Sequence, residues 1–384
     1  MLFGSLTTLL SVASAAVGKI LYAGVNESGG EFGVFGVKGQ GLPGRLGVDY
    51  AFINKTTIDI FVDQEKINFF RVTFLMERMC PLKTGLGSKF NETYFNAYAD
   101  AINHITITKG AYALIDPHNY MRYNDPSGQP FTGSVIGNSS DPTAATTAQF
   151  GQFWGELARR FARNPKVVFG INNEPHDMAT DLILRNNQAA IDGIRRAGAP
   201  QLILAPGNGF TGGHSWTQQT GAGGFAPSSD FMNKLVDPLH NTAIDVHETK
   251  NRIAFPDVDF SGGHDACSQP GPSNLAALTT WLQQNKLKAV ISEFGGGNNQ
   301  NCFNFITDML NYLKANDVYI GWTIWAAGPI WGDNSPCCGP DTGSLEPGNV
   351  NDMGQPNAFS TVWVEAVRPN IPKNLKRNGV SSLS

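Results

Sequence analysis

The sequence predicts an α/β fold, a closed (β/α)8 barrel of the TIM type, from two observations. Eight short apolar runs of strand length alternate with longer amphipathic segments of helical period, the pattern of βα units around a parallel sheet. Eight such units close most naturally into a barrel, and an open doubly wound sheet is the alternative. A length of 384 residues and a hydrophobic content of 41% suit one large domain.

The expected elements follow one another in strict alternation. The expected strands are apolar runs at 20–26, 67–74, 111–117, 167–172, 201–206, 243–247, 289–293 and 319–325. The expected helices show a period near 3.6 and cover 57–66, 93–109, 143–163, 180–198, 274–286, 301–315 and 357–367. Only the segment that follows the fifth strand is weak as a helix.

The two ends of the chain differ from the barrel region. Residues 1–16 are apolar and small and end in an Ala-Ser-Ala step, which predicts a secretory signal peptide; a short buried helix is the alternative. Residues 17–370 are expected to form a single domain. Residues 371–384 form a short polar tail, expected to be loosely ordered.

Cysteines and glycosylation sequons support an oxidising, extracellular setting. Four Asn-x-Ser/Thr sequons begin at Asn26, Asn54, Asn91 and Asn138. The five cysteines are an odd number, so at least one is free or pairs elsewhere. We predict a Cys267–Cys302 disulfide, because each cysteine lies just before a helix on neighbouring barrel units.

Composition narrows the classes of partner. A net charge of -4 without a Lys/Arg-rich run gives no reason to expect nucleic acid. No stretch outside the leader approaches the ~20 apolar residues of a membrane span. No Cys-x-x-Cys spacing occurs, so a zinc site has little support. We expect a secreted monomer without metal or cofactor.

Polar residues recur at the carboxyl ends of the expected strands. In a barrel these ends converge on one mouth, where the βα loops build the site. Apolar buried strands have no structural need for polar residues at the same end every time, so the pattern indicates an enzyme. The residues concerned are Arg71, His118, Asn173, Glu174, His247, Glu293 and Trp325.

Two glutamates among these residues carry the expected chemistry. Glu174 stands before Pro175, which ends regular strand pairing, and Glu293 is followed by Phe294 and three glycines that leave space for a ligand. Two facing carboxylates are what glycosidic cleavage needs: one protonates the leaving oxygen and the other attacks the anomeric carbon. A structural helix cap is the alternative for each.

Six segments resemble the fungal cellulase branch of glycoside hydrolase family 5. They are FFRVTFLMERM, DPHNY, INNEPHD, GNGFTGGHSW, ISEFGGG and GWTIWAAGPIWG. The resemblance covers about residues 20–367, in the family's order. It implies a retaining endo-β-1,4-glucanase that acts on cellulose-like β-glucan, with Glu174 as acid/base and Glu293 as nucleophile.

The same resemblance implies roles for further residues. It places Arg71, His118, Asn173 and His247 around the sugar, Trp325 beneath it as a stacking platform, and Trp216 as a wall further along the cleft. Structural readings stay open: an ion pair for Arg71, interior hydrogen bonding for the two histidines, and core packing for Trp216.

Two positions depart from the family pattern. Thr249 stands where the family usually has a tyrosine that contacts the nucleophile, within a rewritten loop at 248–256. Losing that hydroxyl removes a hydrogen bond of a kind worth ~1.5–3 kcal/mol. Phe210 stands where an indole often lines the cleft. The alternatives are therefore a retaining hydrolase of another β-glycan (mannan, xyloglucan or mixed-linkage glucan) and a catalytically weakened carbohydrate-binding barrel.

Overall fold

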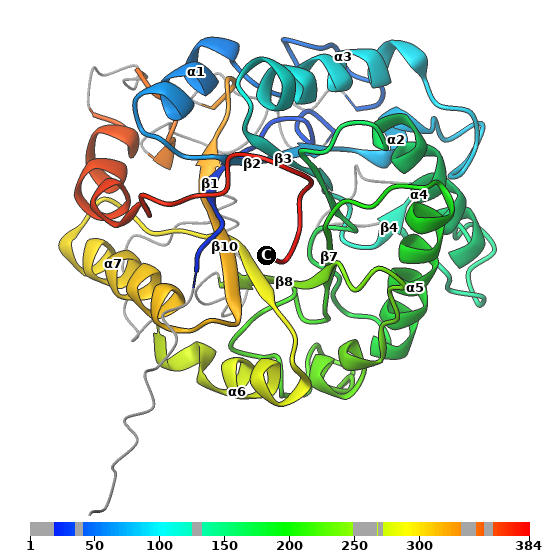
Figure 1. Ribbon diagram of the computed structural model, residues 1–384. Coiled ribbons are helices and arrows are strands. Elements are labelled where there is room, and N and C mark those ends of the chain that lie inside the picture. Colours follow the sequence, from blue (N-terminus) through cyan, green and yellow to red (C-terminus); the bar gives the residue numbers. More distant parts are fainter. Residues whose placement is uncertain are drawn as a thin grey trace, which may run out of the picture.

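The protein folds into a closed barrel of eight parallel strands. The computed structural model describes residues 19–34, 41–124, 133–248, 267, 272–331, 343–348 and 356–384. The strands follow the order β1-β10-β9-β8-β7-β6-β3-β2, and Figure 1 shows the helices as a ring around them. Because β1 pairs in parallel with both β2 and β10, the sheet is closed. The predicted (β/α)8 barrel is therefore confirmed, and the open sheet was the wrong alternative.

Each expected strand and helix has a counterpart. The barrel strands are β1 (Tyr22–Glu27), β2 (Phe69–Phe74), β3 (Tyr112–Pro117), β6 (Val167–Gly170), β7 (Ile203–Pro206), β8 (Thr242–Glu248), β9 (Ala289–Phe294) and β10 (Tyr319–Ala327). The α-helices are α1 (Lys55–Asp63), α2 (Met76–Met79), α3 (Glu92–Asn103), α4 (Thr147–Phe161), α5 (Thr180–Arg196), α6 (Ala276–Asn285) and α7 (Gln300–Ala315). A small antiparallel pair, β4 (Arg122–Tyr123) and β5 (Ser134–Val135), lies outside the barrel.

Several short helical turns complete the ring. Two π-helical segments, η1 (His104–Thr108) and η6 (Phe359–Val367), form the end of the second expected helix and nearly all of the last one. Only the short 3-10 turns η2 (Ser228–Asp230) and η3 (Met232–Lys234) follow β7, which confirms the weak helical pattern there. A further 3-10 turn, η4 (Pro272–Leu275), precedes α6, and η7 (Arg368–Asn370) follows η6.

Local sequence explains where the helices begin. Asn54, Asn91 and Asn299 cap α1, α3 and α7 by accepting backbone N–H groups of the first turn. Helix α4 begins with a full capping box between Thr146 and Gln149. These caps fix the start of each helix and hence the length of the loop that reaches it from the mouth.

The amino-terminal end of the barrel is closed by the carboxyl-terminal tail. Ser381 is fully buried; its Oγ donates to Val167 O (2.6 Å) and accepts from Leu202 N (3.0 Å). Tyr22 Oη donates to Ser382 O at 2.8 Å, and Leu383 packs against the inner apolar cluster of the barrel. In Figure 1 the tail crosses the barrel axis and ends over its centre. The expectation of a loosely ordered tail was wrong, because its backbone groups pair with strand ends that would otherwise lack partners.

The disulfide prediction is confirmed and the sequons divide into two kinds. Cys267 and Cys302 are joined, and Cys80 is a buried free thiol. Asn26 is fully buried and its amide donates to two backbone carbonyls. Asn54 is exposed. The expected signal peptide lies outside the described residues, and no helix among the described residues is long and apolar enough to cross a membrane.

Candidate active site

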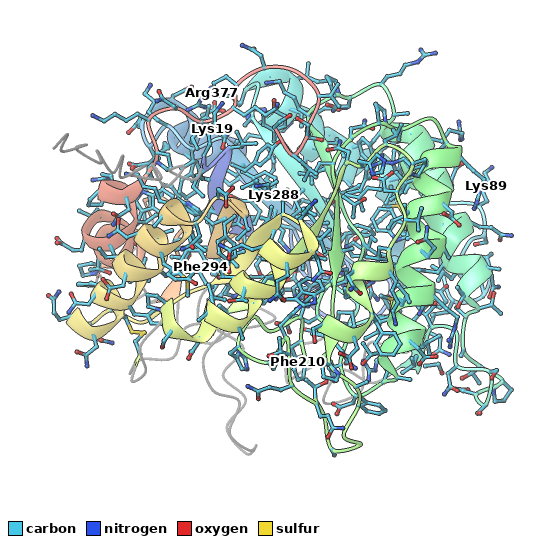
Figure 2. The ribbon with its side chains drawn as sticks, turned by 60° about the horizontal axis from the view of Figure 1, so that its bottom comes forward. Lys19, Lys89, Phe210, Lys288, Phe294 and Arg377 are labelled. Carbon is cyan, nitrogen blue, oxygen red and sulfur yellow. A yellow bond between two sulfur atoms is a disulfide. The ribbon has the colours of Figure 1, made fainter. Side chains whose placement is uncertain are left out.

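The carboxyl ends of the strands form the mouth of the barrel. In Figure 2, Phe294 at the end of β9 and Phe210 after β7 lie below Lys288, which precedes β9, while Arg377 of the tail lies at the opposite end. Glu174 follows β6 with φ of +42°, a left-handed conformation that costs free energy in a residue other than glycine. The chain thus accepts local strain at the position of the expected acid.

The two glutamates face one another across the mouth. Glu174, His247 and Glu293 each bring one ligand-type atom to within 4.8 Å of the others, so an oxygen of Glu174 lies within 4.8 Å of an oxygen of Glu293. Retaining glycosidases hold their carboxyl groups roughly 5–5.5 Å apart and inverting ones roughly 6.5–9.5 Å apart. The approach of these two oxygens is closer to the spacing of a retaining pair than to that of an inverting pair.

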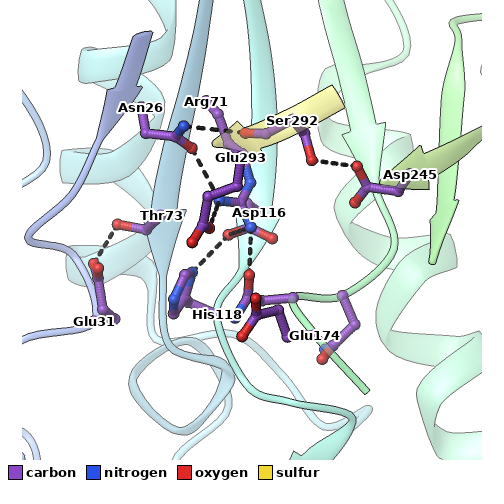
Figure 3. Close-up of polar contacts among 12 residues, drawn as sticks. Asn26, Glu31, Arg71, Thr73, Asp116, His118, Glu174, Asp245, Ser292 and Glu293 are labelled. Atoms are coloured by element: carbon purple, nitrogen blue, oxygen red, sulfur yellow. Dashed lines mark hydrogen bonds and ion pairs between the residues drawn. The ribbon is translucent and has the colours of Figure 1, made fainter. Parts of the chain in front are cut away.

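Arg71, from the middle of β2, supports the floor of the mouth. Its Nη1 donates to Glu293 Oε2 at 2.9 Å and to Asn26 Oδ1 at 2.9 Å. Its Nη2 donates to Asn173 Oδ1 at 2.5 Å and lies 3.0 Å from Asp116 Oδ2. Although burial opposes its charge, Asp116 and Glu293 hold the pKa of Arg71 above its usual range. The guanidinium is a permanent buried cation that holds the Glu293 carboxylate in place (Figure 3).

His247 lies between the two glutamates. Its Nδ1 is 2.9 Å from Glu174 Oε1 and 3.5 Å from Glu293 Oε2. Burial lowers the pKa of His247, which favours the neutral imidazole. A neutral ring that carries its proton on Nδ1 can donate to either carboxylate without adding a charge between them.

His118 and Trp325 lie together on another side of the mouth. Their rings stack with centroids 5.5 Å apart and an interplanar angle of 29°. His118 Nδ1 is 2.9 Å from Asp116 Oδ2. Both rings are 8% exposed, so each keeps a small accessible edge. The structure thus brings His118, Asn173, His247, Trp325 and Arg71 around the glutamates, as the sequence led us to expect.

Trp216 is not among them. It is 1% exposed and its indole packs on Trp281 with ring centroids 5.4 Å apart. A wall of a cleft needs an exposed ring face, and Trp216 has none; the expectation that it contacts substrate was wrong. Phe210 instead stacks on His176, with centroids 4.1 Å apart. Thr249 and the rest of the rewritten loop lie outside the described residues, apart from Glu248, which is buried.

Four buried polar residues of this network were missed by the sequence analysis. Asn26 contacts Arg71, Asp116 joins Arg71 and His118, and Ser292 donates through Oγ to Asp245. The signal that could have found two of them is strand periodicity, since Asp116 and Asp245 stand two positions before His118 and His247. Residues two apart in a strand share a face.

Glu174, His247 and Glu293 are also the group of described residues whose ligand-type atoms lie close enough to hold a metal ion. Two carboxylates and an imidazole are ligands that several divalent cations accept. Glycosidic cleavage by a pair of carboxylates needs no such ion, because both groups of such a pair act directly on the sugar. The expectation of a metal-free and cofactor-free reaction stays a prediction.

A closed βα barrel with two facing glutamates at its mouth, one held by a buried arginine, defines a glycoside hydrolase. The chain belongs to glycosyl hydrolase family 5, since the family described as "Cellulase (glycosyl hydrolase family 5)" matches residues 25–329. It is 57% identical to endoglucanase 1 of Robillarda sp., over 100% of this chain and 97% of that protein. It is 38% identical to endo-β-1,4-glucanase A of Emericella nidulans, over 85% of this chain and 90% of that protein.

The fold is similarly matched by solved structures. XacCel5A, solved in complex with cellopentaose, superposes with a TM-score of 0.72 at 28% identity and covers 90% of this chain and 99% of its own. An endo-β-1,4-glucanase of Xanthomonas axonopodis pv. citri superposes with a TM-score of 0.73 at 31% identity, covering 92% and 100%.

Proposed function

We propose that the protein is a secreted endo-β-1,4-glucanase that cleaves cellulose-like chains with retention of anomeric configuration. The observation that carries the proposal is the approach of the Glu174 and Glu293 carboxylates to within 4.8 Å of one another. This approach suits direct attack by one carboxylate and is closer to the spacing of a retaining pair than to that of an inverting pair.

The proposed reaction has two displacements. In the first, Glu174 gives its proton to the glycosidic oxygen while Glu293 attacks the anomeric carbon, so the C–O bond to the leaving chain breaks as an ester to Glu293 forms. In the second, Glu174 takes a proton from water, and the water oxygen attacks the same carbon and releases Glu293. Arg71 keeps Glu293 aligned throughout, and His247 contacts Glu174 through Nδ1.

The assignment to β-1,4-glucan is supported by the relatives. Endoglucanase 1 and endo-β-1,4-glucanase A are named for that activity, and XacCel5A holds cellopentaose. The stacked His118–Trp325 pair suits the flat C–H face of an equatorially substituted pyranose. The loops after the strands set which β-glycan is preferred.

Secretion is supported by the leader sequence and by three of the four sequons. The Oδ1 atoms of Asn54 and Asn91 cap helices and that of Asn138 accepts from Ser140 N at 3.1 Å, so a glycan on Nδ2 would leave these hydrogen bonds intact. Asn26 is unsuited to a glycan, because it lies in the floor of the mouth. A disulfide in the folded chain fits an oxidising compartment.

The test is hydrolysis of a soluble cellulose derivative and of cello-oligosaccharides by the wild type and by Glu174→Gln. We expect turnover by the wild type and a loss of about 10²- to 10⁴-fold in the variant, the usual effect of removing a general acid. A matched panel of mannan, xyloglucan and mixed-linkage glucan identifies the alternative substrates. Binding of glucan without turnover by the wild type would contradict the proposal and identify a carbohydrate-binding barrel.

A further inference from the structure

Asp116 is a buried aspartate at the end of β3, 1% exposed, and the proposed reaction gives it no role. One oxygen, Oδ2, serves two partners: Arg71 Nη2 at 3.0 Å and His118 Nδ1 at 2.9 Å. Figure 3 shows Asp116 between these two side chains. The carboxylate therefore touches one residue that holds the nucleophile and another that lies against the platform tryptophan.

The charge state of Asp116 decides which atom of His118 carries a proton. Burial opposes ionisation of Asp116, but the charge of Arg71 and the hydrogen bond from His118 outweigh it, so the pKa of Asp116 lies below its usual range. An ionised carboxylate only accepts hydrogen bonds. His118 Nδ1 must therefore be the donor, in the neutral ring as well as in the cation.

We propose that Asp116 is a positioning residue that fixes the proton of His118 on Nδ1 and so presents Nε2 of that ring to the sugar. The neutral ring then offers Nε2 as a hydrogen-bond acceptor for a sugar hydroxyl, and the protonated ring offers it as a donor. Because Oδ2 also holds Arg71, the same carboxylate ties the orientation of the nucleophile to that of His118. The inference deepens the proposed function and rests on it for the sugar, but not for the state of the ring.

The groups around His118 support this role. Burial acts against protonation of the ring, yet the hydrogen bond to Asp116 and the nearby charge of Glu31 together raise the pKa of His118 above its ordinary value, while Arg71 opposes them. Glu31 is itself fixed by Ser28 Oγ and Gly29 N, both at 2.8 Å. Among the described residues, His118 also makes ring contacts with Trp325 and Tyr120, which carry no charge at neutral pH.

The direct test is ¹⁵N NMR of histidine-labelled wild type, Asp116→Ala and Asp116→Asn, with His118→Gln used to assign the signal. In the wild type above its titration, we expect the neutral ring to carry hydrogen on Nδ1. In Asp116→Ala the Nε2–H form, which imidazole favours in water, should replace it. In Asp116→Asn the amide oxygen can still accept from Nδ1, so the tautomer should persist while the titration of His118 moves to lower pH by about one unit or more.

Asp245→Asn is the matched control, because Asp245 is a buried aspartate whose hydrogen bond goes to Ser292 and not to His118. It should leave the His118 tautomer unchanged. An Nε2–H tautomer in the wild type, or an unchanged tautomer in folded Asp116→Ala, would overturn the proposal. Should Asp116→Ala fail to fold, a His118 titration that is the same in Asp116→Asn and the wild type would overturn it instead.

A kinetic measurement separates positioning from mere structural support. Asp116→Ala, which loses the acceptor for Nδ1, should lower kcat/KM on cello-oligosaccharides about 10- to 100-fold, the range of one charge-assisted hydrogen bond. In a His118→Gln background the same change should cost distinctly less, since part of the effect acts through the ring. Equal losses in both backgrounds would contradict a role through His118. The NMR result stands even if the sugar is not a β-glucan, so failure of the two proposals can be told apart.

Discussion

The two ends of the barrel use the same inward-facing strand positions for opposite purposes. At the amino-terminal end these positions hold an apolar plug that includes Tyr22, Phe69 and Tyr112, covered by the tail. Two residues further along β2 and four residues further along β3, the inward positions hold Arg71 and Asp116 in a charged network. The comparison indicates that apolar burial at the amino-terminal end stabilises the fold, whereas the buried charges at the mouth lower its stability.

The cost at the mouth can be read from its buried groups. Arg71, Asp116 and Asp245 are each 2% exposed or less, and burying charges costs several kcal/mol per ion unless they are paired. For Asp245 this cost shows as a raised pKa, because burial disfavours the charged form of its carboxyl group. The plug contains no comparable charge, and each apolar side chain buried there contributes ~1.5–3 kcal/mol. Variants at the mouth should therefore change activity, and variants at the plug should change stability alone.

The largest expected effect is that of Glu293→Gln at the mouth. Removing the proposed nucleophile should lower kcat by about four orders of magnitude or more in steady-state assays on cello-oligosaccharides. Glu27→Gln is the matched control: Glu27 is a fully buried glutamate at the end of β1, beside Asn26, which faces the barrel interior. If Glu27→Gln lowered kcat as much as Glu293→Gln does, the effect of Glu293→Gln could not be assigned to a specific role of Glu293 at the mouth.

Arg71→Met should affect both stability and activity. Removing the cation leaves the Asp116 and Glu293 carboxylates without their buried partner, which costs about 3–5 kcal/mol in the free energy of unfolding. Urea denaturation measures this loss, and kcat on the folded fraction should fall with it because the nucleophile loses its alignment. If Arg71→Met were as stable as the wild type, the Asp116 and Glu293 carboxylates would not need Arg71 as a buried partner, which would contradict the account.

His176 gives the mouth an acid-sensitive stability. Burial and the charge of Arg122 lower the pKa of His176 from 6.5 to about 4. Between these values the unfolded chain binds a proton that the folded chain does not, so stability is present above pH 6.5 and is lost as pH falls to about 4. The loss should reach about 3 kcal/mol. Urea denaturation at pH 7 and pH 4 should show a smaller difference in His176→Gln; an unchanged difference would contradict the lowered pKa.

The smallest effect is expected from Ser381→Ala at the plug. The change removes the hydroxyl that bonds Val167 O and Leu202 N and should cost about 1–3 kcal/mol in unfolding free energy, with kcat unchanged. Ser382→Ala is the control, because its Oγ accepts from Lys376 Nζ and donates to Ser384 O in the partly exposed tail and makes no hydrogen bond to β6. A fall in kcat of Ser381→Ala, measured under conditions in which the variant is fully folded, would contradict the separation between the two ends of the barrel.

The sequence predicted the barrel because its signal is repeated eight times. Each strand is a short apolar run, and Glu174, His247 and Glu293 stand at or just beyond the carboxyl ends of their strands, so they could be placed together without a structure. Arg71 was expected at the same end but lies in the middle of β2, from where its long side chain reaches Glu293. The predicted Cys267–Cys302 pair also proved correct.

The remaining features depend on contacts that a local pattern does not contain. The tail was expected to be loosely ordered, yet Ser381 bonds Val167 at the start of β6 and Leu202, the residue just before β7. Trp216 is an aromatic residue of the kind that lines sugar clefts, and was expected as a wall of the cleft, but it packs on Trp281. Asp116 carries no signal apart from its spacing to His118, and its double contact with Arg71 exists only once the barrel is closed.

The central claim is that Glu174 and Glu293 act as a retaining pair, and the anomeric configuration of the first product tests it most directly. Proton NMR of cello-oligosaccharide hydrolysis should show the β anomer first, with the α anomer appearing only through mutarotation. Initial release of the α anomer would mean that water attacks the sugar directly, and would contradict both the nucleophilic role of Glu293 and the significance of the 4.8 Å approach.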